Sequence, residues 1–155
     1  MLAGKKKVEP LVVYKPGDKK TTVNAYGASW DIKWYYYSFD SSYLQLQQSY
    51  TSKQNVTAIV GPFDFTKYKK MIIDFTGMTE SDYHTEQTRV GYLKGSSYSS
   101  ANSVDSQDFS FSRADGVNKH AEFDISNQSG NRWIYFYYIK KDETNWTRIT
   151  NIRLE

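Results

Sequence analysis

The stretch that decides the fold is Arg132-Trp133-Ile134-Tyr135-Phe136-Tyr137-Tyr138-Ile139. In an extended chain successive side chains point to opposite faces, and here both faces carry large apolar or aromatic groups. A strand of this composition is covered on both sides. A polar, turn-like link follows at residues 140–145, and residues 146–154 alternate again. We therefore predict two strands joined by a hairpin, the first of them buried on both faces.

Shorter runs of the same kind recur along the chain. The pattern predicts further strands at 11–14, 30–37, 44–47, 56–60, 70–76, 89–94, 109–111 and 120–125. Gly61-Pro62 and Gly77 are expected to end two of them, and the serine-rich run 96–103 is expected to be the least ordered loop. No window shows a sustained helical period. Nine or ten short strands with turns every 8–12 residues predict an all-β, two-sheet antiparallel jelly-roll β-sandwich, less than about a tenth helical.

Length and composition indicate one domain. The chain has 155 residues, and its 17% aromatic content argues against disorder. Residues 1–20 hold two lysine clusters, 5–7 and 19–20, and are interpreted as a basic leader with a possible first edge strand. Residues 21–155 form the predicted sandwich domain. The first four residues lack the apolar core of a signal peptide.

Several classes of protein are excluded by residues that the sequence lacks. There is no cysteine, so disulfides and zinc–thiolate sites cannot form. No apolar run is long enough to span a membrane as a helix. The net charge of +3 is not arranged as a basic stripe, which argues against nucleic acid as a partner. Phosphate-binding glycine motifs are absent, and no cofactor is expected.

The sequence also argues against an enzyme. His84 and His120 are the only imidazoles, and no G-x-S-x-G pattern marks a nucleophile. Ordinary polar histidines are the better interpretation. A glycosidase needs two carboxylates across a cleft, and no spacing brings together any two of Asp74, Glu122 and Asp124. We expect no catalytic residues.

One segment could hold a divalent cation. In an extended chain Asp82, His84 and Glu86 share one face and could offer nitrogen and oxygen ligands. A solvated edge strand would show the same alternation, and no other cluster completes the shell. Asp105 and Asp108 could serve a calcium site, but no calcium-binding loop motif supports it. No metal site is therefore assigned.

The surplus of aromatic residues is the remaining functional signal. Strands 30–37 and 132–139 carry aromatics on both faces, and only one face of each can be the core. A thick core with tyrosine hydroxyls reaching solvent would explain most of them. Aromatic residues that are instead exposed would form a surface for binding a ligand or another subunit. Sugars stack their apolar faces on aromatic rings, and the residues between the aromatic ones are mostly Ser, Gln, Asn and Asp. The candidate ligand-binding residues are Tyr35, Tyr37, Tyr135, Tyr137 and Trp146.

Residues 24–155 also resemble a known group of modules. The segments 63–75, 123–126, 133–139 and 149–155 resemble successive strands of jelly-roll modules in bacteriophage tail and fibre proteins. The broader group is the galactose-binding-like, carbohydrate-binding-module-like sandwich. The resemblance implies a non-catalytic carbohydrate-binding or adhesion module of a phage or prophage virion, made in the bacterial cytoplasm. Its partners would be a polysaccharide or cell-surface glycan and other virion subunits. A purely structural virion domain is the alternative, and an enzyme acting on polysaccharide ranks below both.

Overall fold

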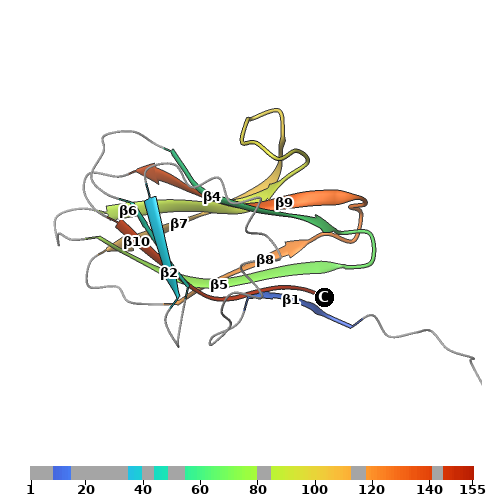
Figure 1. Cartoon of the computed structure of the whole chain (residues 1–155), viewed down its shortest axis with the longest axis horizontal. Helices are drawn as coiled ribbons and strands as arrows, with labels where there is room; N and C mark the ends of the chain where they lie inside the picture. The colour runs from blue at the N-terminus through green and yellow to red at the C-terminus, as the bar shows by residue number, and fades with distance from the viewer. Residues whose placement is uncertain are drawn as a thin grey trace, which may run out of the picture.

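The structure is a computed structural model that describes residues 9–14, 35–39, 44–48, 55–79, 85–112, 118–140 and 145–155. These residues form ten β-strands in two antiparallel sheets that lie face to face (Figure 1). No helix able to span a membrane occurs among them. The predicted all-β, two-sheet sandwich is confirmed.

The larger sheet has six strands in the order β2-β3-β10-β5-β8, with β1 pairing beside β10. Its strands are β1 (Leu11–Tyr14), β2 (Tyr35–Phe39), β3 (Leu44–Gln48), β5 (Lys70–Thr79), β8 (Lys119–Asp124) and β10 (Asn145–Leu154). The smaller sheet has four strands in the order β4-β9-β6-β7. Its strands are β4 (Asn55–Asp64), β6 (Thr85–Leu93), β7 (Ser103–Ser112) and β9 (Asn131–Lys140).

The predicted hairpin between residues 132–139 and 146–154 is wrong. β9 pairs with β4 and β6 in the four-stranded sheet, whereas β10 pairs with β1, β3 and β5 in the six-stranded sheet. A short polar link is compatible with a hairpin and with a crossing between sheets, so its sequence does not distinguish them. The prediction that β9 is covered on both faces is confirmed, because Ile134, Tyr135 and Phe136 are all fully buried.

Two predicted strand ends are also wrong, for reasons visible in the packing. β5 continues through Gly77 to Thr79. A Cβ at Gly77 would lie 2.6 Å from Cδ2 of Phe111, so glycine is needed there to admit the ring of a core residue. β4 continues through Gly61-Pro62, where the register shifts between Val60 and Phe63. Proline is tolerated because β4 is an edge strand.

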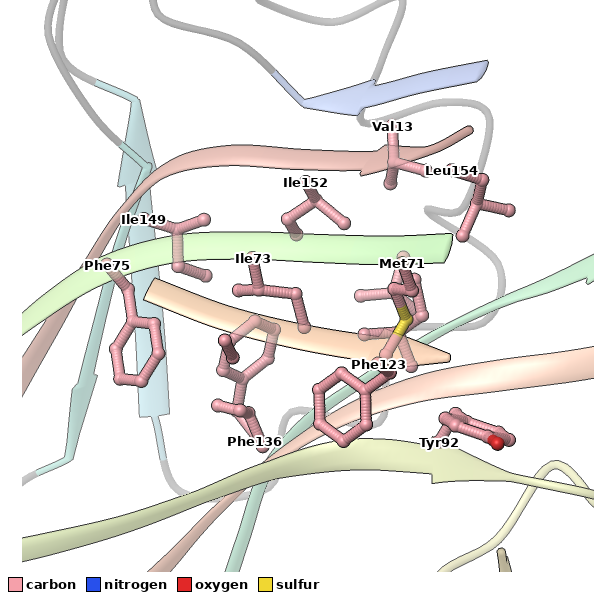
Figure 2. Close-up of a cluster of buried hydrophobic side chains, with 14 of the residues drawn as sticks. Val13, Met71, Ile73, Phe75, Tyr92, Phe123, Phe136, Ile149, Ile152 and Leu154 are labelled. Carbon is pink, nitrogen blue, oxygen red and sulfur yellow. The ribbon is translucent and has the colours of Figure 1, made fainter. Parts of the chain in front are cut away.

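The main core fills the space between the sheets (Figure 2). The six-stranded sheet contributes buried side chains from β1, β5, β8 and β10, and the four-stranded sheet contributes others from β4, β6, β7 and β9. Alternation in β8 places Ala121 and Phe123 in this core, followed by Ile125, as predicted. In β10 a register shift between Ile149 and Asn151 lets Ile149 and Ile152 both face inward.

Two turns of the same pattern carry the chain from one sheet to the other. In Asp64-Phe65-Thr66, between β4 and β5, Asp64 Oδ1 accepts hydrogen bonds from Thr66 N and Oγ1 at 2.9 and 2.6 Å. In Asp124-Ile125-Ser126, between β8 and β9, Asp124 Oδ1 accepts from Ser126 N and Oγ at 3.0 and 2.6 Å. These bonds hold the pKa of both aspartates below the ordinary value.

The two turns are also bonded to each other. Gly130, which lies just before β9, donates its N–H to Thr66 Oγ1 at 2.9 Å and accepts from Phe65 N at 3.0 Å. Gly130 has a φ of +77°, a conformation that favours glycine. The short side-chain bonds therefore stabilise the turns at the ends of β4 and β8, where the chain leaves one sheet for the other.

Because both faces of β9 are buried, truncating either of two neighbouring side chains there should lower the free energy of unfolding. Phe136 lies in the main core, and Tyr135 lies in a second cluster on the outer face. Phe136→Ala is expected to lower the free energy of unfolding by about 3–5 kcal/mol and Tyr135→Ala by about 2–5 kcal/mol, measured by denaturant titration. Ser110→Ala, at an exposed position of β7, is the control and should change it by less than about 0.5 kcal/mol. A cost below about 1 kcal/mol for Tyr135→Ala would contradict the burial described.

Candidate functional site

Alternation along β9 creates the outer face of the four-stranded sheet. Ile134 and Phe136 point into the main core, so Trp133, Tyr135 and Tyr137 point outward. The register places them opposite Leu93, Gly91 and Arg89 of β6. One face of this sheet therefore carries three aromatic side chains in a row, with a cation beside the last.

The loop 94–102 between β6 and β7 covers the middle of this row. It stands above the outer side of the four-stranded sheet (Figure 1, yellow). The ring centroid of Tyr98 lies 5.2 Å from that of Tyr135. The Tyr98 ring is also stacked on Tyr137, with a centroid distance of 4.8 Å and an interplanar angle of 25°. Together with Ile59 and Leu93, Tyr135 is fully buried beneath it, while Tyr98, Trp133 and Tyr137 stay half-buried.

Backbone and side-chain hydrogen bonds hold this loop, which was expected to be the least ordered. Lys94 N donates to Asn102 O at 2.9 Å, Ser103 N donates to Ser99 O at 3.0 Å, and Asn102 Nδ2 donates to Ser97 O at 2.9 Å. Composition suggested a mobile segment because serine has no packing role of its own. The one signal to the contrary was Tyr98, a lone aromatic residue among serines.

A charged pair lies beside the aromatic residues. Arg89 Nε and Nη2 donate to the two carboxylate oxygens of Asp108 at 2.7 and 3.1 Å. This two-pronged bond, together with a hydrogen bond to Tyr98, raises the pKa of Arg89 above its ordinary value. Arg89 and Asp108 keep 31% and 52% of their side chains exposed, so their outer edges can still bond a ligand.

We call this surface the outer aromatic patch and define it by Tyr98, Trp133, Tyr137, Arg89 and Asp108. Half-buried rings supported from below present rigid apolar faces at little cost in conformational entropy. The guanidinium and carboxylate offer donors and acceptors of fixed orientation. The arrangement suits a ligand with one apolar face and a rim of hydroxyl groups.

The predicted ligand-binding residues are divided between the two sheets. Tyr35 and Tyr37 lie in β2, and Trp146 lies in β10, so all three belong to the six-stranded sheet. Their side chains fall outside the described residues. Of the two in β9, Tyr137 is in the outer aromatic patch, but Tyr135 is covered by the loop and a ligand cannot reach it. The sequence pattern identified the outward face of β9 and missed Tyr98, Trp133, Arg89 and Asp108.

The weak metal candidates Asp82, His84 and Glu86 lie where no side chains are described. Asp82 and His84 lie outside the described residues, and only the backbone of Glu86 is described. Asp108 is bonded to Arg89, and Asp105 Oδ1 accepts from Ser106 N at 2.8 Å. In the described part of the chain no three His, Asp or Glu side chains are arranged so that they could hold a metal ion.

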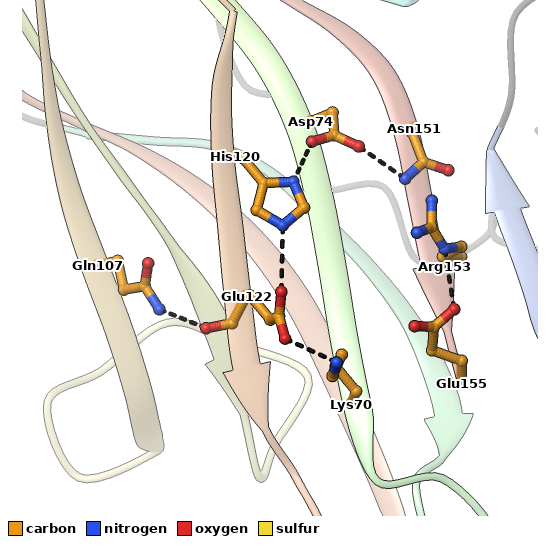
Figure 3. A network of polar contacts seen from close by, with 8 residues as sticks. All are labelled: Lys70, Asp74, Gln107, His120, Glu122, Asn151, Arg153 and Glu155. Carbon is orange, nitrogen blue, oxygen red and sulfur yellow. Dashed lines mark hydrogen bonds and ion pairs between the residues drawn. The ribbon is translucent and has the colours of Figure 1, made fainter.

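A second polar cluster lies on the outer face of the six-stranded sheet (Figure 3). His120 Nδ1 lies 2.5 Å from Asp74 Oδ1, and His120 Nε2 lies 3.2 Å from Glu122 Oε2. Asn151 Nδ2 donates to Asp74 Oδ2 at 2.9 Å, and Lys70 Nζ lies 2.8 Å from Glu122 Oε1. Pairing of β5 with β8 places Asp74 and Glu122 on the two sides of the His120 ring, an arrangement that no spacing in the sequence indicated.

This cluster does not form a paired-carboxylate catalytic site. The imidazole of His120 occupies the space between Asp74 and Glu122, where a glycosidase would hold the scissile bond. Each carboxylate has a further partner in Asn151 or Lys70. The cluster is a ladder of cross-strand contacts that joins β8, β5 and β10.

Comparison with known proteins bears on the fold. No protein-family model matches the chain, and no curated protein matches it. Among solved structures, a mutant of CBM29-2, a family 29 carbohydrate binding module, matches with a TM-score of 0.59 and 9% identity over 96% of this chain and 92% of that chain. A family 29 carbohydrate binding module matches with a TM-score of 0.57 and 9% identity over 94% of this chain and 87% of that chain. Another CBM29-2 mutant, complexed with cellulohexaose, matches with a TM-score of 0.57 and 9% identity over 94% of this chain and 89% of that chain. At this identity the likeness shows a shared β-sandwich fold.

The geometry of His120 predicts a pH-dependent contribution to stability. Hydrogen bonds to Asp74 and then to Glu122 raise the pKa of His120, because only the protonated ring donates from both nitrogens. The contribution is therefore complete below the unfolded pKa of about 6.5 and is lost as the pH rises through the raised folded value. Since 53% of the side chain is exposed, it should not exceed about 1 kcal/mol.

The measurement is denaturant unfolding of the natural protein and of His120→Gln between pH 5.5 and 9, a window set by the ordinary histidine pKa of about 6.5. The free-energy difference between the two proteins should be largest near the acidic limit and shrink toward the alkaline one. A difference that stays constant over this range would show that the protonated ring is not stabilised by its two carboxylates.

Proposed function

We propose that this chain is a non-catalytic carbohydrate-binding module and that its ligand binds at the outer aromatic patch. The observation that carries the proposal is the set of half-buried rings of Tyr98, Trp133 and Tyr137 beside the Arg89–Asp108 pair. Aromatic faces stack on the apolar face of a sugar ring, and the charged pair can bond its hydroxyl groups. The shared fold with family 29 carbohydrate binding modules supports this class of ligand.

The outer aromatic patch fits a small ligand better than a protein partner. Tyr135, Ile59 and Leu93, which would form the apolar centre of a large interface, are already buried in a cluster against which Tyr98, Trp133 and Tyr137 pack. Stable protein interfaces bury about 800 Å² on each partner and depend on such a centre. A purely structural role, in which this domain packs against other virion subunits, is therefore the second candidate function.

We keep a phage or prophage virion as the proposed setting. Its support is the resemblance carried by the repeated turn pattern at Asp64–Thr66 and Asp124–Ser126 and by the aromatic strand β9. In such an assembly many copies of a weak site would act together, so avidity would compensate for a small patch. The protein would be made in the bacterial cytoplasm and would act outside the cell after release.

A glycan array probed with the multimerised protein tests the proposal. The natural protein should give signal on a defined set of glycans, and Trp133→Ala and Tyr137→Ala should reduce it about tenfold, because each removes about 1.4 kcal/mol of stacking. His120→Gln, on the opposite sheet, is the matched control and should leave the signal unchanged. Thermal melts must show that all variants are folded. Equal signal from the natural protein and both aromatic variants would contradict the proposed site.

A further inference from the structure

The three aromatic residues of β9 would form a long platform if nothing lay over them. Trp133, Tyr135 and Tyr137 are two residues apart on one strand, so their neighbouring Cα atoms are separated by roughly 6.6–6.8 Å and the attachment points of the row span about 13 Å. An uncovered row of this length could support several consecutive sugar rings of an extended chain.

The loop 94–102 interrupts this row at its centre. Tyr98 contacts both Tyr135 and Tyr137, and Tyr135 has no exposed surface. Hydrogen bonds between Lys94 and Asn102 and between Ser99 and Ser103 close the loop at its base. An extended saccharide therefore cannot lie flat from Trp133 to Tyr137.

Across the strands toward β7, the described residues offer no second aromatic platform. The register places Tyr137 opposite Arg89, and Arg89 opposite Asp108 at the sheet edge formed by β7. A ligand that leaves the ring of Tyr137 in this direction meets a charged pair and then the edge of the sheet. Along β9 and toward β7, the described surface therefore leaves room for a single stacked sugar unit beside hydrogen-bonding groups.

We propose that the loop 94–102 restricts the outer aromatic patch to a short saccharide unit of one or two rings, such as a chain end or a branch sugar. Tyr98 is the residue that sets this limit, because it occupies the position over Tyr135 that a further sugar ring would need. The inference rests on the proposed function, since it concerns the length of ligand accepted by the same site.

A variant with a shortened loop tests the role of the covering segment. Leu93 and Ser103 are directly paired across the β6–β7 hairpin, so an Asn-Gly turn can replace residues 94–102 without changing the register. Because this change also uncovers Ile59 and Leu93, Tyr98→Ser is the second variant, which removes the ring and keeps the loop. Melting curves establish that each variant is folded, and if the shortened loop prevents folding, Tyr98→Ser carries the test.

The readout is an array of immobilised cello-, manno-, xylo- and galacto-oligosaccharides of one to six units. On the oligosaccharide series that binds, the natural protein should reach its full signal with the two-unit ligand, and its signal with the six-unit ligand should differ by no more than about twofold. The signal of the folded variants should instead rise about tenfold between the two-unit and the six-unit ligand. A signal from the natural protein that climbs about tenfold over that range, or variants with the same length profile as the natural protein, would overturn the inference and leave the proposed function intact. A blank array for all proteins would overturn both.

Discussion

The alternation of side chains along β9 is the constraint on which the rest of the structure depends. The strand carries Ile134 and Phe136 on one face and Tyr135 and Tyr137 on the other, so exposing either face to water would be unfavourable. The six-stranded sheet covers the first face and creates the main core. The loop 94–102 covers the middle of the second face. The interior of the sandwich and the candidate site on its exterior are therefore two consequences of one strand.

Two hydrogen-bonded turns pass the chain between the sheets, one before β5 and one before β9. Asp64 and Asp124 each accept two hydrogen bonds from a hydroxyl residue two positions later, and Gly130 links one turn to the other. Both carboxylates have lowered pKa values, so these bonds persist until the pH falls through the lowered values and the carboxylates are protonated. Each turn lies in the connection that leads to the next strand, which is β5 from Lys70 and β9 from Asn131.

Much of the fold could be predicted from local pattern. Period-2 alternation identified the inward residues of β8 and the double burial of β9, because both depend on residues near each other in sequence. The pairing of strands could not be predicted, since the short polar link at 140–145 is compatible with a hairpin and with a crossing between sheets. Gly77 and Gly61-Pro62 looked like strand ends because their actual roles, admitting the ring of Phe111 and continuing an edge strand, depend on distant partners.

The candidate site was predictable only in part for the same reason. Tyr137 could be identified from β9 alone, but Tyr98 reaches it from a loop that composition marked as mobile. Arg89 and Asp108 carry no signal in sequence, because 19 residues separate them and only the β6–β7 register brings them together. The contact between Asp74 and His120 likewise depends on pairing of β5 with β8.

The central claim is that the ligand surface is the outer face of the four-stranded sheet. The most direct measurement is a titration of ¹⁵N-labelled protein with the glycan of highest array signal, followed by ¹H–¹⁵N correlation spectra. The account predicts that the shifted signals cluster at the indole N–H of Trp133, the backbone of Tyr137 and Tyr98, and the guanidinium of Arg89, while His120 and its neighbours on the six-stranded sheet do not move. Shifts confined to the six-stranded sheet, with Trp133 and Arg89 unchanged, would contradict it.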